Sequence, residues 1–98
     1  MLFALTTTDK PGNLQLRVDT RPAHVEYLNG LKASGTLKLA GPFLDADGKP
    51  NGSLVVVEAD SIEAAREILA EDPYAKVGLF GSTELRAWNW TFGKPESI

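Results

Sequence analysis

The chain has 98 residues, a formal net charge of −3, no cysteine and a single histidine. This length predicts one domain, residues 1–98, with a modest core, and the acidic balance argues against nonspecific nucleic-acid binding. The absence of cysteine excludes disulfides, thiol chemistry and cysteine zinc sites, and one histidine cannot build a histidine-rich metal site within one chain.

The first eight residues, MLFALTTT, are expected to form a strand covered on both faces, because both alternating sets of positions are apolar. A turn is expected over residues 9–12. Residues 13–34 then have a helical pattern, and Gly35 suits the position just past a helix C-terminus. Pro22, inside this stretch, is expected to kink the helix or to begin its second part.

One face of this expected helix changes character along its length. Leu28 and Leu31 mark the buried side near its C-terminal end, and the same side carries Arg17, Arg21 and His24 at spacings i, i+4 and i+7. Because a pure core would not contain these cations, the pattern favours a cleft. The alternative is a buried histidine bonded to a backbone carbonyl, with both arginines reaching out to solvent.

The middle of the chain reads as a hairpin of two strands. Residues 36–44 are expected to form a strand interrupted at Gly41 and Pro42, which implies a bulge or an edge position. The loop at residues 45–52 resembles a calcium loop, but its twelfth position is Val56 instead of glutamate, and the calcium interpretation is rejected. Residues 53–59 contain four consecutive apolar side chains, which predicts a central strand.

A second amphipathic helix is expected over residues 61–71, N-capped by Asp60 or Ser61. Asp72 falls on its apolar stripe at the C-terminal end, where an anion opposes the helix dipole. One explanation is an Asp-Pro turn, in which the side chain accepts hydrogen bonds from nearby backbone N–H groups. The other is a cation held against Asp72 across a cleft.

The last element is expected to be a strand over residues 83–92, with a loose tail at 93–98. One face of this strand carries Trp88, Trp90 and Phe92. The order β-α-β-β-α-β predicts an α+β, ferredoxin-like fold, with two helices on one face of a four-stranded antiparallel sheet. The first and third strands would be central. The uncovered face is so apolar that we expect a homodimer in which two sheets pack face to face.

Several motifs resemble the YCII-related (YciI-like) proteins, which are small dimeric α/β-barrel domains, and they span nearly the whole chain in the right order. The matching pieces are Arg21-Pro22-Ala23-His24, Gly35-Thr36-Leu37, Ala40-Gly41-Pro42, Gly52-Ser53, Ser61-Ile62-Glu63-Ala64-Ala65, Asp72-Pro73-Tyr74 and Trp88. The resemblance implies a ferredoxin-like fold and an active-site His–Asp pair at His24 and Asp72. Its wider superfamily includes many reactions, so the fold does not select one.

A His24–Asp72 pair would suit general acid–base catalysis, namely isomerisation or elimination on a small anionic or aromatic metabolite. Arg21 and, further from the histidine, Arg17 could hold an anionic group. Other cleft-lining candidates are Ser53, Tyr74 and the backbone around Gly41. The alternative function is a noncatalytic module that binds or senses a small ligand in the same cleft.

No separate nucleophile, cofactor or metal site is predicted, and the two arginines disfavour heme ligation by His24. No apolar run approaches the roughly 20 residues of a membrane helix, so no membrane partner is expected. The N-terminus lacks a signal-peptide pattern, which makes the cytoplasm the expected location.

Overall fold

The computed structural model describes residues 1–95 and contains four strands, two long helices and one short helix. The strands are β1 (Leu2–Asp9), β2 (Leu37–Leu44), β3 (Pro50–Glu58) and β4 (Phe80–Trp88). The helices are α1 (Leu14–Ala33), α2 (Ile62–Ala70) and α3 (Pro73–Lys76). The predicted order is confirmed, with α3 as an addition.

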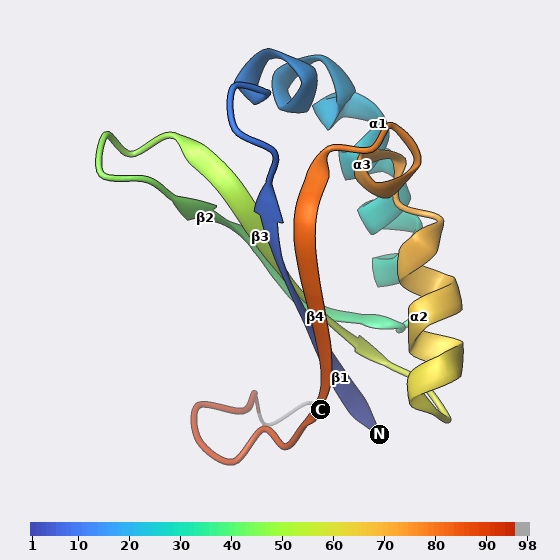
Figure 1. Cartoon of the computed structure of the whole chain (residues 1–98). Coiled ribbons are helices and arrows are strands. Elements are labelled where there is room, and N and C mark those ends of the chain that lie inside the picture. The colour runs from blue at the N-terminus through green and yellow to red at the C-terminus, as the bar shows by residue number, and fades with distance from the viewer. Residues whose placement is uncertain (96–98) are drawn as a thin grey trace.

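The strands form one antiparallel sheet in the order β2-β3-β1-β4. The two strands with apolar residues on both faces, β1 and β3, are therefore central, as predicted. All three helices lie on one face of the sheet (Figure 1). This is the predicted ferredoxin-like α+β fold.

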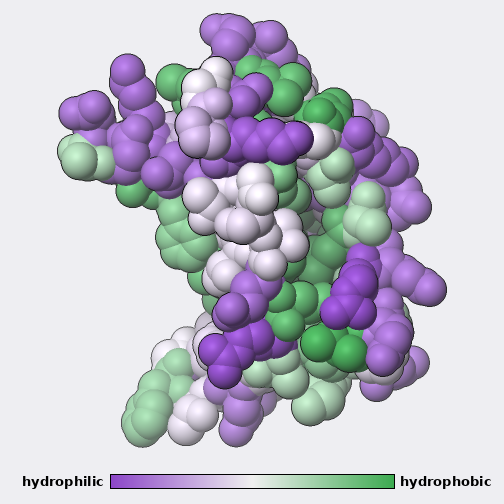
Figure 2. Space-filling model, viewed as in Figure 1, coloured by the Kyte–Doolittle hydropathy of each residue, from purple (hydrophilic) through white to green (hydrophobic). Residues whose placement is uncertain are grey.

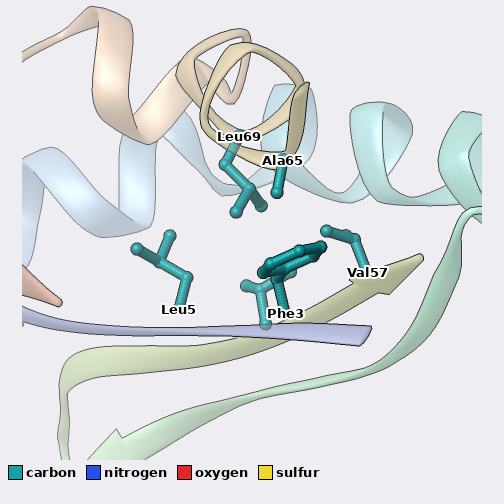
Figure 3. Close-up of a cluster of buried hydrophobic side chains, with 6 residues drawn as sticks. Phe3, Leu5, Val57, Ala65 and Leu69 are labelled. Atoms are coloured by element: carbon teal, nitrogen blue, oxygen red, sulfur yellow. The ribbon is translucent and has the colours of Figure 1, made fainter. Parts of the chain in front are cut away.

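The core lies between α2 and the two central strands. Phe3 and Leu5 of β1 pack with Val57 of β3 beneath Ala65 and Leu69 of α2 (Figure 3). These side chains follow the period of two in the strands and the period of 3.6 in the helix, which turns both apolar faces inward. The core therefore fixes α2, and with it the residues that follow its C-terminus.

Both long helices form as predicted, within one or two residues at each end. Helix α1 continues through Pro22 from Leu14 to Ala33, so no second helix begins there. In α2, the Ser61 hydroxyl accepts a hydrogen bond from the Ala64 N–H, which confirms the serine N-cap. The Tyr27 hydroxyl donates to the Ile68 carbonyl at 2.5 Å and ties α1 to α2.

The hairpin β2–β3 differs in detail from the prediction. Strand β2 runs through Gly41 and Pro42 without ending, and the predicted alternative of an edge position is confirmed, which explains why the strand tolerates a proline. Gly52 is needed for a close approach: a Cβ atom there would lie 2.2 Å from the carbonyl oxygen of Thr7 on β1. Any other residue would push the two central strands apart.

Strand β4 begins three residues earlier than predicted and ends at Trp88, so Trp90 and Phe92 lie outside it. The reason is the length of its neighbour. Trp88 pairs with Leu2, the first residue of β1, and beyond it no strand remains to pair with. The two indole rings still pack together, with centroids 5.5 Å apart. Residues 93–95 are irregular, and the rest of the predicted tail lies outside the described residues.

The sheet face opposite the helices carries apolar side chains. Phe3 and Leu5 point to the helices, so the alternate residues of β1 and their cross-strand partners face the other way. This outer face includes Leu2, Ala4, Leu54, Phe43 and Trp88. Hydrophobic groups reach the surface there, on the left side of Figure 2 below the β2–β3 hairpin.

No helix in residues 1–95 is long and apolar enough to cross a membrane.

Candidate functional site

Helix α1 presents the three predicted cations to one region but in different environments. Arg17 and His24 are buried against the sheet, with 5% and 9% of their surfaces exposed, whereas Arg21 between them is exposed. Arg17 and His24 lie two turns apart on the helix and therefore point the same way. The inward cationic face predicted from their spacing is present, and only its middle member reaches solvent.

His24 and Asp72 meet as a buried pair. The His24 Nδ1 lies 2.8 Å from the Asp72 Oδ1, and only 3% of Asp72 is exposed. The same oxygen accepts a hydrogen bond from the Tyr74 backbone N–H at 2.9 Å and caps α3. Both explanations for the unusual aspartate hold together, because Asp72 forms the Asp-Pro turn and its side chain also binds His24 of the predicted cationic face.

The pairing fixes which imidazole nitrogen is free. An ionised carboxylate only accepts hydrogen bonds, so the His24 Nδ1 must donate its proton to Asp72. The lone pair of the neutral imidazole then resides on Nε2. Asp72 thus orients the ring and leaves Nε2 as the nitrogen able to take or give a proton.

Tyr74 contacts both buried residues of this helix face, His24 and Arg17. Its ring stacks on the His24 imidazole, with centroids 3.9 Å apart and planes inclined by 17°. The Arg17 guanidinium carbon lies 4.6 Å from the centroid of the same ring. Because Asp72 caps the helix that carries Tyr74, one short turn positions both partners of His24.

Arg17 is held by an acidic partner that the sequence interpretation missed. Its Nε donates to the Asp9 Oδ2 at 2.6 Å, and its Nη2 donates to the Asp9 Oδ1 at 3.1 Å and to the Ser53 Oγ at 2.9 Å. Burial alone would lower the pKa of Arg17, but the hydrogen bonds and charge of Asp9 outweigh it and raise the pKa. Asp9 does not lie in the turn predicted over residues 9–12, because β1 extends through it. The available signal was its place in the inward series Phe3, Leu5, Thr7.

A cavity of about 220 Å³ opens between α1 and the β2–β3 hairpin. Six of the seven predicted site residues line it, namely Arg17, Arg21, His24, Gly41, Ser53 and Tyr74. Asp72 does not line the cavity; it is buried behind His24 and binds the Nδ1 of that ring. The apolar walls were not predicted; they include Val18, Val25, Leu28, Ala40, Pro42, Pro50 and Val55.

Gly41 contributes no conformational requirement to this wall. A Cβ atom there would have no heavy atom within 4 Å, and its φ is not positive. Among residues 1–95, no group of three or more His, Asp or Glu side chains is arranged to hold a metal ion.

Both tyrosines are expected to stay protonated at a pH where exposed phenols ionise. Burial, followed by the charges of Asp72 and Glu71, raises the pKa of Tyr27 to about 12, and burial also raises the pKa of Tyr74. A raised phenol pKa means that these groups stabilise the fold fully below about pH 10, the unfolded value, and lose that contribution as pH rises through the folded values.

The ultraviolet absorbance of tyrosinate measures this directly, because the chain has only these two tyrosines. The native protein should show little tyrosinate at pH 10, whereas the urea-unfolded chain should be about half ionised there. Equal titration curves for the native and unfolded chains would contradict the expectation.

Comparisons with known proteins agree on one family. The model of the YCII-related domain matches residues 1–89. Protein YciI of Escherichia coli is 32% identical over 98 residues, an alignment that covers 94% of this chain and all of that protein. A protein of Emericella nidulans, described as "Derivative of benzaldehyde biosynthesis cluster protein C", is 41% identical over 73 residues, covering 67% of this chain and 74% of that protein.

A solved structure with high similarity is the 5-chloro-2-hydroxyhydroquinone dehydrochlorinase TftG of Burkholderia phenoliruptrix, in complex with 2,5-dihydroxybenzoquinone. Its TM-score is 0.82 at 37% identity, and the match covers 91% of this chain and 94% of that one. An antibiotic biosynthesis monooxygenase has a TM-score of 0.55 at 12% identity, with coverage of 93% and 99%, and this likeness concerns the fold alone.

Proposed function

The chain belongs to the YCII-related domain family, and we propose that it is an acid–base catalyst acting on a small anionic or phenolic molecule in the cavity between α1 and the β2–β3 hairpin. The observation that carries the proposal is the buried His24–Asp72 pair, whose histidine lines the cavity. A carboxylate bonded to Nδ1 fixes the tautomer and orientation of the ring and stabilises the imidazolium that forms on proton transfer. Isomerisation or elimination is the reaction class that needs only this pair.

Arg21 is proposed to hold the anionic group of the ligand. It lines the cavity and is exposed, and within the described part of the chain no carboxylate lies in ion-pair distance of it. Arg17, in contrast, is already bound on two nitrogens by Asp9. A guanidinium with free donors can grip a carboxylate or an oxyanion through two hydrogen bonds.

The ligand class is supported by the similar dehydrochlorinase, whose structure holds 2,5-dihydroxybenzoquinone. That molecule is a small oxygenated ring, and the cavity here combines apolar walls with Arg21, Ser53 and His24. Apolar walls bury a ring, and a few polar groups orient its oxygens. We propose the same general class for this chain, without assigning the chlorinated substrate.

Titration calorimetry with 2,5-dihydroxybenzoquinone, benzoate and sulfate tests the proposal. We expect binding of at least the quinone, weakened roughly tenfold or more in Arg21→Ala because a charge-assisted hydrogen bond is lost. Arg66→Ala, which removes an exposed arginine on α2, serves as the matched control and should bind like the wild type. If no ligand binds, or if both variants lose the same affinity, the proposal fails.

The partner proposed for the outer sheet face is a second copy of the chain. Trp88 is 39% exposed and Phe43 is 43% exposed, on a face that no helix of residues 1–95 covers. Burying one such aromatic side chain stabilises by roughly 1.5–3 kcal/mol. Two sheets packed face to face would bury this surface on both copies.

Sedimentation equilibrium at micromolar concentration should therefore give twice the mass of one chain. Trp88→Glu should shift the protein to monomer, because it places a charge in the interface. Val77→Glu changes an apolar side chain that is 46% exposed outside this face and should leave the dimer intact. A monomeric wild type, or equal dissociation in both variants, would rule out this interface.

A further inference from the structure

Ser53 has a hydroxyl proton that no neighbouring group uses. Its Oγ accepts a hydrogen bond from the Arg17 Nη2 at 2.9 Å, and no other side-chain hydrogen bond of Ser53 occurs within residues 1–95. A guanidinium has no acceptor, so Arg17 can only donate and the serine oxygen can only accept from it. Asp9, which binds the other side of Arg17, keeps this arrangement fixed.

The neighbour across the strand does not take the proton either. Thr7 of β1 pairs directly with Ser53 of β3, and both side chains are on the helix side of the sheet. In residues 1–95, the Thr7 Oγ1 is the one buried side-chain polar atom without any hydrogen-bond partner. Ser53 lines the cavity, so the cavity is where its O–H can still find an acceptor.

We propose that Ser53 donates this hydrogen bond to an oxyanion of the ligand, so that the cavity binds a phenol or enol in its ionised form. The inference rests on the proposed function and deepens it. When the ligand gives its proton to the His24 Nε2, the electron pair of the broken bond stays on the ligand, with its charge on oxygen. The Ser53 O–H, polarised by Arg17, meets that charge, and the proton returns from His24 in the reverse step.

The Tyr74 ring links the base, His24, to the donor, Ser53. Tyr74 stacks on His24 and also lies against Arg17, the residue bonded to Ser53. A donor fixed before the charge develops stabilises it without reorganisation, which is the principle of an oxyanion hole. His24 and Ser53 thus provide a base and an oxyanion donor in one cavity.

The probe for this inference is 4-nitrophenol, whose phenolate absorbs visible light while the neutral phenol does not. Wild-type protein should bind the phenolate in preference to the phenol, which lowers the apparent pKa of the bound probe. Ser53→Ala and Ser53→Cys should lose roughly ten- to hundredfold in phenolate affinity, the effect of removing a hydrogen bond to a charged group. Binding of 4-nitroanisole, which has no ionisable oxygen, should be unchanged.

Ser53→Thr retains a hydroxyl and should restore the preference for the phenolate, a rescue that a packing role would not give. Ser82→Ala, an exposed serine on β4, should behave like the wild type. If both Ser53 variants fold and keep the phenolate preference, the inference is overturned while the proposed function stands. If the wild type binds no nitrophenolate, the inference is also overturned, and the quinone titration alone decides the proposed function.

Discussion

Asp9→Asn is expected to lower the free energy of unfolding by about 3–5 kcal/mol, because it leaves the Arg17 charge buried without a counterion. The two side chains are 7% and 6% exposed, and two hydrogen bonds join them. An asparagine of the same shape keeps one acceptor but removes the negative charge. Since small domains are stable by only about 5–15 kcal/mol, this loss is a large share of the total.

Urea unfolding followed by tryptophan fluorescence measures the loss, at one fixed protein concentration because dimerisation would couple to stability. The matched control is Glu71→Gln, which removes the carboxylate of the exposed Lys76–Glu71 pair, whose side chains are 59% and 67% exposed. Such a surface pair contributes at most about 1 kcal/mol. Equal effects of the two substitutions would show that Asp9 does not neutralise a buried charge.

The double variant Asp9→Leu/Arg17→Met tests the physical cause. Replacing both members of a buried ion pair by apolar side chains removes the desolvation penalty together with the attraction, which is often neutral or stabilising. We expect it to recover most of the stability lost in Asp9→Asn. The affinity of this double variant for the phenolate should stay below that of the wild type, because Arg17 and its bond to Ser53 are gone.

The fold could be predicted because its main determinants are local patterns. Two-sided apolarity marks β1 and β3 as central strands, and the helical periods of α1 and α2 are long enough to read. The C-terminal end of β4 could not be predicted from its local pattern. Its alternation continues to Phe92, but strand pairing stops at Trp88, where β1 begins. The limit is set by the partner strand, which the local pattern does not contain.

The candidate site likewise has features that local spacing predicts and features that depend on how distant elements pack. The spacing of Arg17, Arg21 and His24 predicted a shared helix face, and the misplaced anion Asp72 pointed to a cation partner. Which arginine stays free depends on Asp9, and that contact requires α1 to pack back over the end of β1. The stacking of Tyr74 on His24 likewise depends on how α3 docks, and a four-residue helix has no periodic pattern to indicate it.

His24→Ala is expected to lower proton transfer to a bound ligand by about 10²–10⁴-fold, the usual contribution of a positioned acid–base group. The reaction to follow is deuterium exchange at the ring carbons of 2,5-dihydroxybenzoquinone, monitored by proton NMR in heavy water. Exchange requires a proton to be delivered to a carbon and removed again, so it reports the catalyst directly and does not depend on a leaving group.

Asp72→Asn should also slow the exchange, but by less than His24→Ala does, because the imidazole that transfers the proton remains. An asparagine oxygen still accepts from the His24 Nδ1 but no longer stabilises the imidazolium by its charge, so the barrier to proton uptake rises. Arg66→Ala is again the control and should exchange at the wild-type rate. Quinone affinity must be measured alongside, because a variant that still binds but no longer exchanges has lost catalysis specifically. If the wild type and His24→Ala both bind the quinone but exchange it no faster than buffer alone does, the cavity is a binding site without acid–base catalysis, and the noncatalytic alternative is correct.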